Sequence, residues 1–154
     1  MSSSRFPGQG PNFVPAYQVS GIPYVTSSAA PKANTDPVLR VSFPNVTKSI
    51  MVKNTGDKAL RVSFTKSGSY KAGEACEDGT PVTGFKSNYF VIPPCSTSSG
   101  VADAPPTVFD VRCKEIFFRS DEVGHVAPFS LYASLTGIEQ FPVVTGSKGF
   151  KGVG

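Results

Sequence analysis

The stretch that decides the fold is Leu39-Arg-Val-Ser-Phe43, and the same five letters return as Leu60-Arg-Val-Ser-Phe64. In both copies apolar side chains alternate with polar ones, which is typical of a β-strand that buries one face. In the second copy Leu60, Val62 and Phe64 are expected to face the core, and Arg61, Ser63 and Thr65 to face solvent. The residues around the two copies differ, so chance similarity between two amphipathic strands explains the repeat better than duplication.

The same period continues through the rest of the chain. It predicts further strands over residues 46–53, 88–92, 109–114 and 129–136, a short last strand at Val143-Val144, and long loops over 67–87 and 93–107. No segment shows a helical repeat with caps. We therefore expect an all-β fold of about eight antiparallel strands in two packed sheets. The chain has no Trp, so the immunoglobulin signature is absent and a single jelly-roll sandwich is favoured.

Residues 1–37 differ from this pattern and are predicted to form an extended N-terminal arm. Prolines recur along them, at 7, 11, 15, 23, 31 and 37, which excludes a helix. The arm is nevertheless apolar, and its candidate contact residues are Phe13, Tyr17, Ile22, Tyr24 and Val25. These side chains either fold back on the chain's own body or dock onto another subunit, and we favour docking. The jelly-roll body is then expected over 38–145, followed by a flexible Gly-rich tail over 146–154.

Composition restricts the kinds of partner. The net charge is +4 without any basic block, so direct nucleic-acid binding is not expected. Phe117-Phe118-Arg119 alone places aromatic rings beside a cation, and core packing explains it better. No apolar run reaches the length of about 18 residues that a membrane span needs. The first ten residues lack an apolar region, so no secretory signal is expected.

Cysteine and histidine give little support for catalysis. The one histidine, His125, lies in a polar loop, and Cys113 alternates with apolar neighbours as a core residue does. A nucleophilic pair of His125 with Cys113 or Cys95 is therefore disfavoured. A zinc site of Cys76, Cys95, Cys113 and His125 lacks closely spaced ligand pairs. Three cysteines define no disulfide framework, although a bridge between Cys76 and Cys95 stays open.

One further cluster of titratable residues, Glu74, Glu77 and Asp78, has no regular spacing of metal ligands and is interpreted as a solvated acidic loop. We therefore expect no catalytic residue, no metal site and no cofactor, and the chain is not expected to be an enzyme.

Four stretches carry a resemblance to a known family. They are VPAYQVSGIPYVTS at 14–27, VSFPNVTKSIMVKN at 41–54, RCKEIFF at 112–118 and FSLYASLTGI at 129–138. Together they resemble the penton, or vertex capsid protein, of large icosahedral nucleocytoplasmic DNA viruses. The resemblance implies a homopentamer at each fivefold vertex of the virion, synthesised in the host cell cytoplasm. It also implies double-jelly-roll major capsid proteins as neighbours, with the arm reaching minor capsid proteins beneath the shell.

Two other functions compete with a structural one. A ligand- or receptor-binding, lectin-like β-sandwich would use exposed loop aromatics, with Tyr70, Phe85 and Tyr89 as candidates. A cupin-like enzyme usually needs more than one histidine, which this chain lacks. If the structural interpretation holds, deletion of residues 1–37 is expected to leave a folded body that no longer enters a shell.

Overall fold

The computed structural model describes residues 21–34, 36–75, 88–95 and 104–139. Within these ranges the chain forms eight β-strands and one turn of 3-10 helix, η1. The elements are β1 (Ile22–Ala30), β2 (Leu39–Ser42), β3 (Thr47–Asn54), β4 (Leu60–Ser63), η1 (Ser67–Ser69), β5 (Phe90–Ile92), β6 (Thr107–Phe109), β7 (Glu115–Ser120) and β8 (Ala127–Leu135). The predicted strand at Val143-Val144 and the Gly-rich tail lie outside the described residues.

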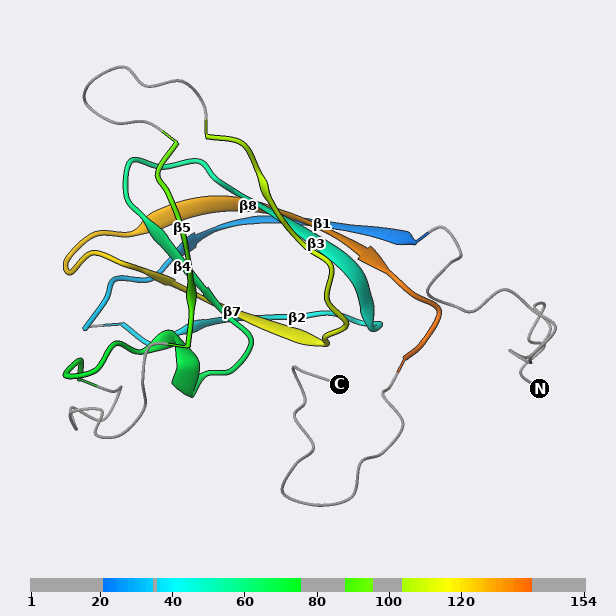
Figure 1. The fold of residues 1–154 in the computed structure, drawn as a ribbon, viewed down its shortest axis with the longest axis horizontal. Coiled ribbons are helices and arrows are strands. Elements are labelled where there is room, and N and C mark those ends of the chain that lie inside the picture. Colours follow the sequence, from blue (N-terminus) through cyan, green and yellow to red (C-terminus); the bar gives the residue numbers. More distant parts are fainter. Residues whose placement is uncertain (1–20, 35, 76–87, 96–103, 140–154) are drawn as a thin grey trace, which may run out of the picture.

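The strands form two four-stranded antiparallel sheets, one with the order β1-β8-β3-β6 and the other with the order β2-β7-β4-β5. Figure 1 shows them as two layers, with β1 and β8 in the upper layer and β2 and β7 in the lower. The predicted all-β sandwich is therefore confirmed.

The pairing follows a simple rule along the chain. The first strand pairs with the last, β2 with β7, β3 with β6 and β4 with β5. The first half of the chain thus runs antiparallel to the second half, as in one long hairpin. Two further pairings, β3 with β8 and β4 with β7, fold this hairpin into the two sheets. Each sheet consequently contains strands from both halves of the chain.

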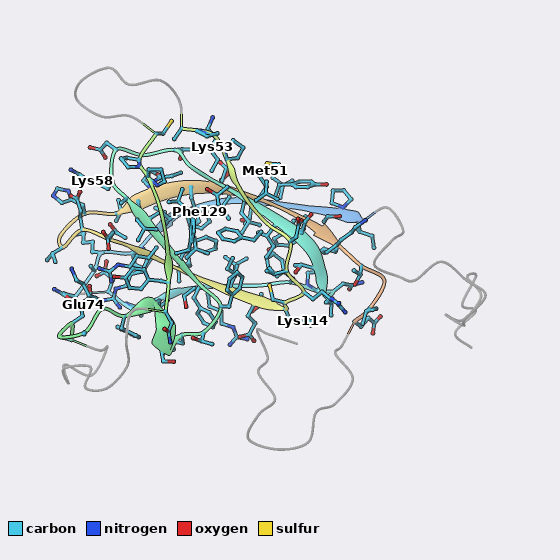
Figure 2. The ribbon with its side chains drawn as sticks, viewed as in Figure 1. Met51, Lys53, Lys58, Glu74, Lys114 and Phe129 are labelled. Carbon is cyan, nitrogen blue, oxygen red and sulfur yellow. The ribbon has the colours of Figure 1, made fainter. Side chains whose placement is uncertain are left out.

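The core lies between the sheets and is built from the inward positions of the alternating strands. Val41 of β2 and Leu60 and Val62 of β4 are buried, as the repeated pentapeptide predicts. Phe118 of β7 and Phe129 of β8 stack across the two layers, with ring centroids 4.1 Å apart. Figure 2 shows Phe129 in the middle of the body. Burying such large apolar side chains is the main favourable contribution to folding.

The first strand falls within the stretch predicted to be an arm. Residues 22–30 are extended, but they pair with β8 over their whole length, from Ile22 opposite Leu135 to Ala30 opposite Ala127. The sandwich therefore begins by Ile22 and not at Val38. An edge strand leaves one row of backbone groups unpaired, so it tolerates a proline such as Pro23. Deletion of residues 1–37 would consequently remove a complete strand, contrary to the expectation of an intact body.

The single strand predicted over 109–114 is also wrong, because two strands of different sheets flank this stretch. Strand β6 ends at Phe109 and β7 begins at Glu115, and the chain crosses between the sheets in the interval. The Thr47 hydroxyl accepts a hydrogen bond from the Cys113 amide (3.0 Å) and donates one to the Val111 carbonyl (2.7 Å). In this crossing segment the side chain of Cys113 still points into the core. The alternation of inward and outward side chains therefore continues although these residues belong to neither strand.

Candidate functional site

The predicted contact residues of the arm divide into two groups in the structure. Val25 is exposed on the outer face of β1, and Ile22 is exposed at the beginning of the strand, on the same face as Tyr24. Tyr24 points inward and packs against the core. Its ring makes an edge-to-face contact with Phe43, with centroids 5.3 Å apart. For Tyr24 this favours the alternative in which the side chain folds back on its own body. Phe13 and Tyr17 lie outside the described residues.

An exposed apolar row crosses the outer face of the β1-β8-β3-β6 sheet. Val25 lies opposite Tyr132, Tyr132 opposite Met51, and Met51 opposite Val108, so each strand contributes one side chain. The exposed fraction is 70% for Val25 and 54% for Val108, against 40% for Tyr132 and 38% for Met51. Exposed apolar surface is thus greatest at the two opposite edges of the sheet. Figure 2 shows Met51 on the upper, outward side of the body.

The rows on either side of this one are mostly polar. One contains Ser27, Ser130 and Lys53, in which the hydroxyls of Ser27 and Ser130 are hydrogen-bonded at 3.1 Å. The other contains Ser134 and Ser49. The middle of the sheet face is therefore only one apolar side chain wide, which makes it a poor docking surface by itself.

The edge formed by β5 and β6 is apolar as well. Phe109 of β6 makes edge-to-face contacts with Phe64 and with Phe90 of β5, at centroid distances of 5.9 and 5.5 Å. Phe90, Val91 and Val108 remain exposed. We call Ile22 and Val25 the β1 flank, and Phe90, Val91 and Val108 the β5/β6 flank. Because β1 and β6 are the outermost strands of one sheet, the two flanks lie on opposite sides of the molecule.

Polar side chains gather on the outer face of the other sheet, beneath the segment that follows β4. Arg61 is buried there, and it lies directly opposite Arg119 of β7 in the strand register. Its Nε donates to Asp121 Oδ1 at 2.6 Å, and its Nη1 lies 2.7 Å from Glu74 Oε1. Glu74 Oε2 also accepts the Lys71 amide at 3.0 Å. These bonds join β4 to the turn that follows β7 and to residues 71–74.

The expectation that Arg61, Ser63 and Glu74 are solvated is therefore wrong. All three are buried, because η1 and the residues after it cover the outer face of β4. Glu77 and Asp78, the other members of the predicted acidic loop, lie outside the described residues. Sequence alternation shows which side chains face away from the core, but it does not show whether a loop later covers that face.

Arg119 is the second buried cation of this face. Its guanidinium lies over the ring of Tyr70, with Cζ 4.7 Å from the centroid, and Arg61 lies at the same distance over Tyr89. Nε and Nη1 of Arg119 have no hydrogen-bond partner among the residues that the structure describes. A cation over an aromatic face is electrostatically favourable, and more so where water is excluded. Tyr70 is buried in this contact and is unavailable as an exposed ligand-binding aromatic.

The ion pairs also determine the charge state of Arg61. Burial acts to lower its pKa, but the hydrogen bonds to Asp121 and Glu74 act in the opposite direction and the pKa is raised overall. Arg61 is therefore charged at neutral pH. The cluster is a set of internal ionic contacts, which hold a covering segment against a sheet.

The candidate nucleophile and base lie in different environments. Cys113 is buried, as predicted, with its Sγ 3.5 Å from the Thr47 hydroxyl, and burial raises the pKa of its thiol. His125 is exposed in the turn between β7 and β8, as predicted. Among the described residues no group of three or more His, Cys, Asp or Glu side chains has the arrangement of a metal site. Cys76 and Phe85 lie outside these residues, so the Cys76–Cys95 bridge stays a prediction.

No helix in the described part of the chain is long and apolar enough to cross a membrane. The chain matches no protein-family model, no curated protein and no solved structure. Its function must therefore be inferred from the residues and from their arrangement in the two sheets.

Proposed function

We propose that the chain is a structural protein of an icosahedral virus shell, a penton capsomer that closes fivefold vertices as a homopentamer. The strand order carries the proposal. Pairing of β1 with β8, β2 with β7, β3 with β6 and β4 with β5 supports a jelly roll, a fold in which one long hairpin wraps into two sheets. Jelly rolls occur mainly as capsid subunits, lectins and cupins, so the side chains must decide among these.

The exposed side chains support the capsid alternative. The described surface presents large apolar residues at both edges of the sandwich, on the β1 flank and the β5/β6 flank. Exposed apolar surface of this kind is typical of contacts between proteins. The lectin-like alternative has less support, because Tyr70 is buried against Arg119. The cupin-like alternative would have to build its metal site around the single histidine, His125, which lies in an exposed turn.

In this proposal the protein catalyses no reaction and acts only through contacts with other capsid subunits. Neighbouring bodies pack side by side around the fivefold axis of the virion, and segments outside the sandwich reach the major capsid protein and the minor capsid proteins beneath the shell. The protein is made in the host cell cytoplasm and is assembled into the vertex from there. The curvature of the shell comes from the shape of the body and from the angle at which neighbouring bodies meet.

Native mass spectrometry of the full-length protein over a concentration series tests the proposal. We expect a closed pentamer whose fraction rises with protein concentration. A ring of another size contradicts the fivefold assignment. A protein that stays monomeric and binds oligosaccharides on a glycan array supports the lectin-like function instead.

A further inference from the structure

We infer that the β1 flank of one copy packs against the β5/β6 flank of the next copy, in a head-to-tail contact. The inference rests on the proposed structural role, because it supplies the lateral contact that a ring of subunits needs. It names the two surfaces and commits to a second copy of this chain as the partner. Four features of the described residues lead to it.

The first feature is the distribution of exposed apolar surface. Along the row that crosses the sheet, exposure is greatest at its two ends, Val25 and Val108, and smallest in the middle. At the second end the rings of Phe90 and Phe109 join β5 to β6, so that exposed Phe90 lies at the same edge as Val108. Val91 is exposed on the outer face of the other sheet, opposite Arg61 in the strand register. The most exposed apolar side chains of this row therefore lie at the two opposite edges of the sheet.

The second feature is charge. Residues 22–30 contain no charged side chain, and residues 88–95 and 104–109 contain none either. Two surfaces built on uncharged segments can come together without desolvating an ion, which is the costly part of burying polar surface. Each flank is thus electrostatically compatible with the other. A strongly acidic or basic partner would gain nothing from either strand.

The third feature concerns symmetry. A twofold contact uses the same patch on both copies, so a dimer through β1 leaves the β5/β6 flank exposed, and a dimer through β5 and β6 leaves Val25 exposed. A head-to-tail contact covers both patches, and it produces a ring where the rotation closes. The arrangement of two unlike apolar patches on opposite edges therefore favours a ring over a dimer.

The fourth feature is the backbone at the β5/β6 edge. Pro93 and Pro94 follow β5, and Pro105 and Pro106 precede β6. Proline has no N–H to donate, and prolines at a sheet edge block pairing with a further strand. The contact is therefore made by side chains of the two flanks, above all Val25 and Val108, and not by extension of a sheet.

The test uses one chemical change at three exposed valines. Val25→Asp disables the β1 flank, Val108→Asp disables the β5/β6 flank, and Val123→Asp is the matched control in the turn between β7 and β8. All three side chains are more than half exposed, so folding should survive, and circular dichroism with thermal unfolding checks this. Sedimentation velocity and native mass spectrometry then measure the assembly state of each variant.

We expect Val25→Asp and Val108→Asp each to be monomeric, and Val123→Asp to assemble like the wild type. An equimolar mixture of the two monomeric variants should form a one-to-one pair, because the first retains the β5/β6 flank and the second retains the β1 flank. This pair cannot grow further, since its two outer flanks both carry an aspartate. Only a head-to-tail contact through these flanks predicts such complementation.

Other results separate this inference from the proposed function. A wild-type pentamer that Val25→Asp leaves intact overturns the flank contact and retains the capsomer. A ring of another size, with complementation between the variants, retains the flank contact and overturns the fivefold role. Assembly lost in Tyr132→Asp but not in Val25→Asp moves the contact to the sheet face and overturns the inference. A wild type that is monomeric up to its solubility limit overturns both.

Discussion

Arg61 shows how one side chain can hold a loop against a sheet. It faces away from the core on β4, yet it is buried between Glu74 and Asp121. A buried ion pair contributes little net stability, but removal of one partner leaves the other charge buried and unpaired. The single substitution and the double substitution should therefore have very different consequences.

Arg61→Met should lower the free energy of unfolding by about 3–5 kcal/mol, because it leaves the Glu74 carboxylate buried without its cation. Replacing Glu74 as well, in Arg61→Met/Glu74→Leu, should recover most of that loss. Urea unfolding at neutral pH measures both variants. If the loss of unfolding free energy in the double variant equals the sum of the losses in the two single variants, the two residues are not coupled as the 2.7 Å contact requires.

Cys113 provides a second prediction at this scale, which concerns pH. Burial raises the pKa of its thiol in the folded protein above its ordinary value. The neutral thiol therefore stabilises the fold fully below the unfolded pKa of about 8.5, and this contribution is lost as pH rises through the folded pKa. The difference in unfolding free energy between the wild type and Cys113→Ala should shrink above about pH 8.5. If the difference in unfolding free energy between the two proteins stays constant above this pH, the pKa of the Cys113 thiol is not raised by burial.

At the scale of the element, β1 is the strand whose contribution can be isolated most directly. It pairs with β8 through nine residues and places Tyr24 against Phe43. Deletion of residues 1–30 should make β8 a new edge strand of the sheet. We expect thermal unfolding of this variant to lose its cooperativity, or its midpoint temperature to fall strongly. Deletion of residues 1–20, which ends before the strand, is the control and should retain the cooperative transition. Equal behaviour of the two deletions would show that β1 contributes nothing to the sandwich.

The strands should also differ in hydrogen exchange. Strand β8 pairs with β1 on one side and β3 on the other, and β7 likewise lies between β2 and β4. β6 and β5 are short edge strands with one neighbour each. We expect amide protection to be greatest in β8, β3, β7 and β4 and least in β5 and β6, because inner strands open only when the sheet itself opens. Exchange followed by mass spectrometry or NMR measures the order.

Period-two alternation predicted part of this architecture and missed the rest for identifiable reasons. It located β2, β4 and β8 because each has one face in the core and regular polar positions between. It missed β1, whose second half, Ser27-Ser-Ala-Ala30, has little contrast between its faces. It merged the β6–β7 crossing into one strand because Cys113 keeps its inward direction there. Similarly, the buried position of Arg61 depends on a loop folded over the sheet, which no local pattern records.

For the molecule as a whole, the proposed ring makes a prediction about salt. The strands of both flanks are uncharged, so their contact should be held by burial of apolar surface. Raising the ionic strength screens exposed ion pairs but does not weaken apolar contacts. The assembled fraction at a fixed protein concentration should therefore stay constant or rise from low to high sodium chloride. Dissociation at high salt would instead indicate that the copies are held together by charged surface groups. Arg40 and Glu115, whose Nη2 and Oε1 lie 2.6 Å apart, are examples of such groups.

The pairing of the first strand with the last also makes the two ends of the sandwich different from each other. Ile22, where β1 begins, lies beside Leu135, where β8 ends. Figure 1 shows the beginning of β1 and the end of β8 at the right of the body, and the β7–β8 turn at the left. The chain thus enters and leaves the sandwich through the same pole. Copies related by rotation about an axis along the strands would direct all their entry and exit points to one surface of the plate they form, and all their β7–β8 turns to the other. Such a plate has an inside and an outside before any other protein binds to it.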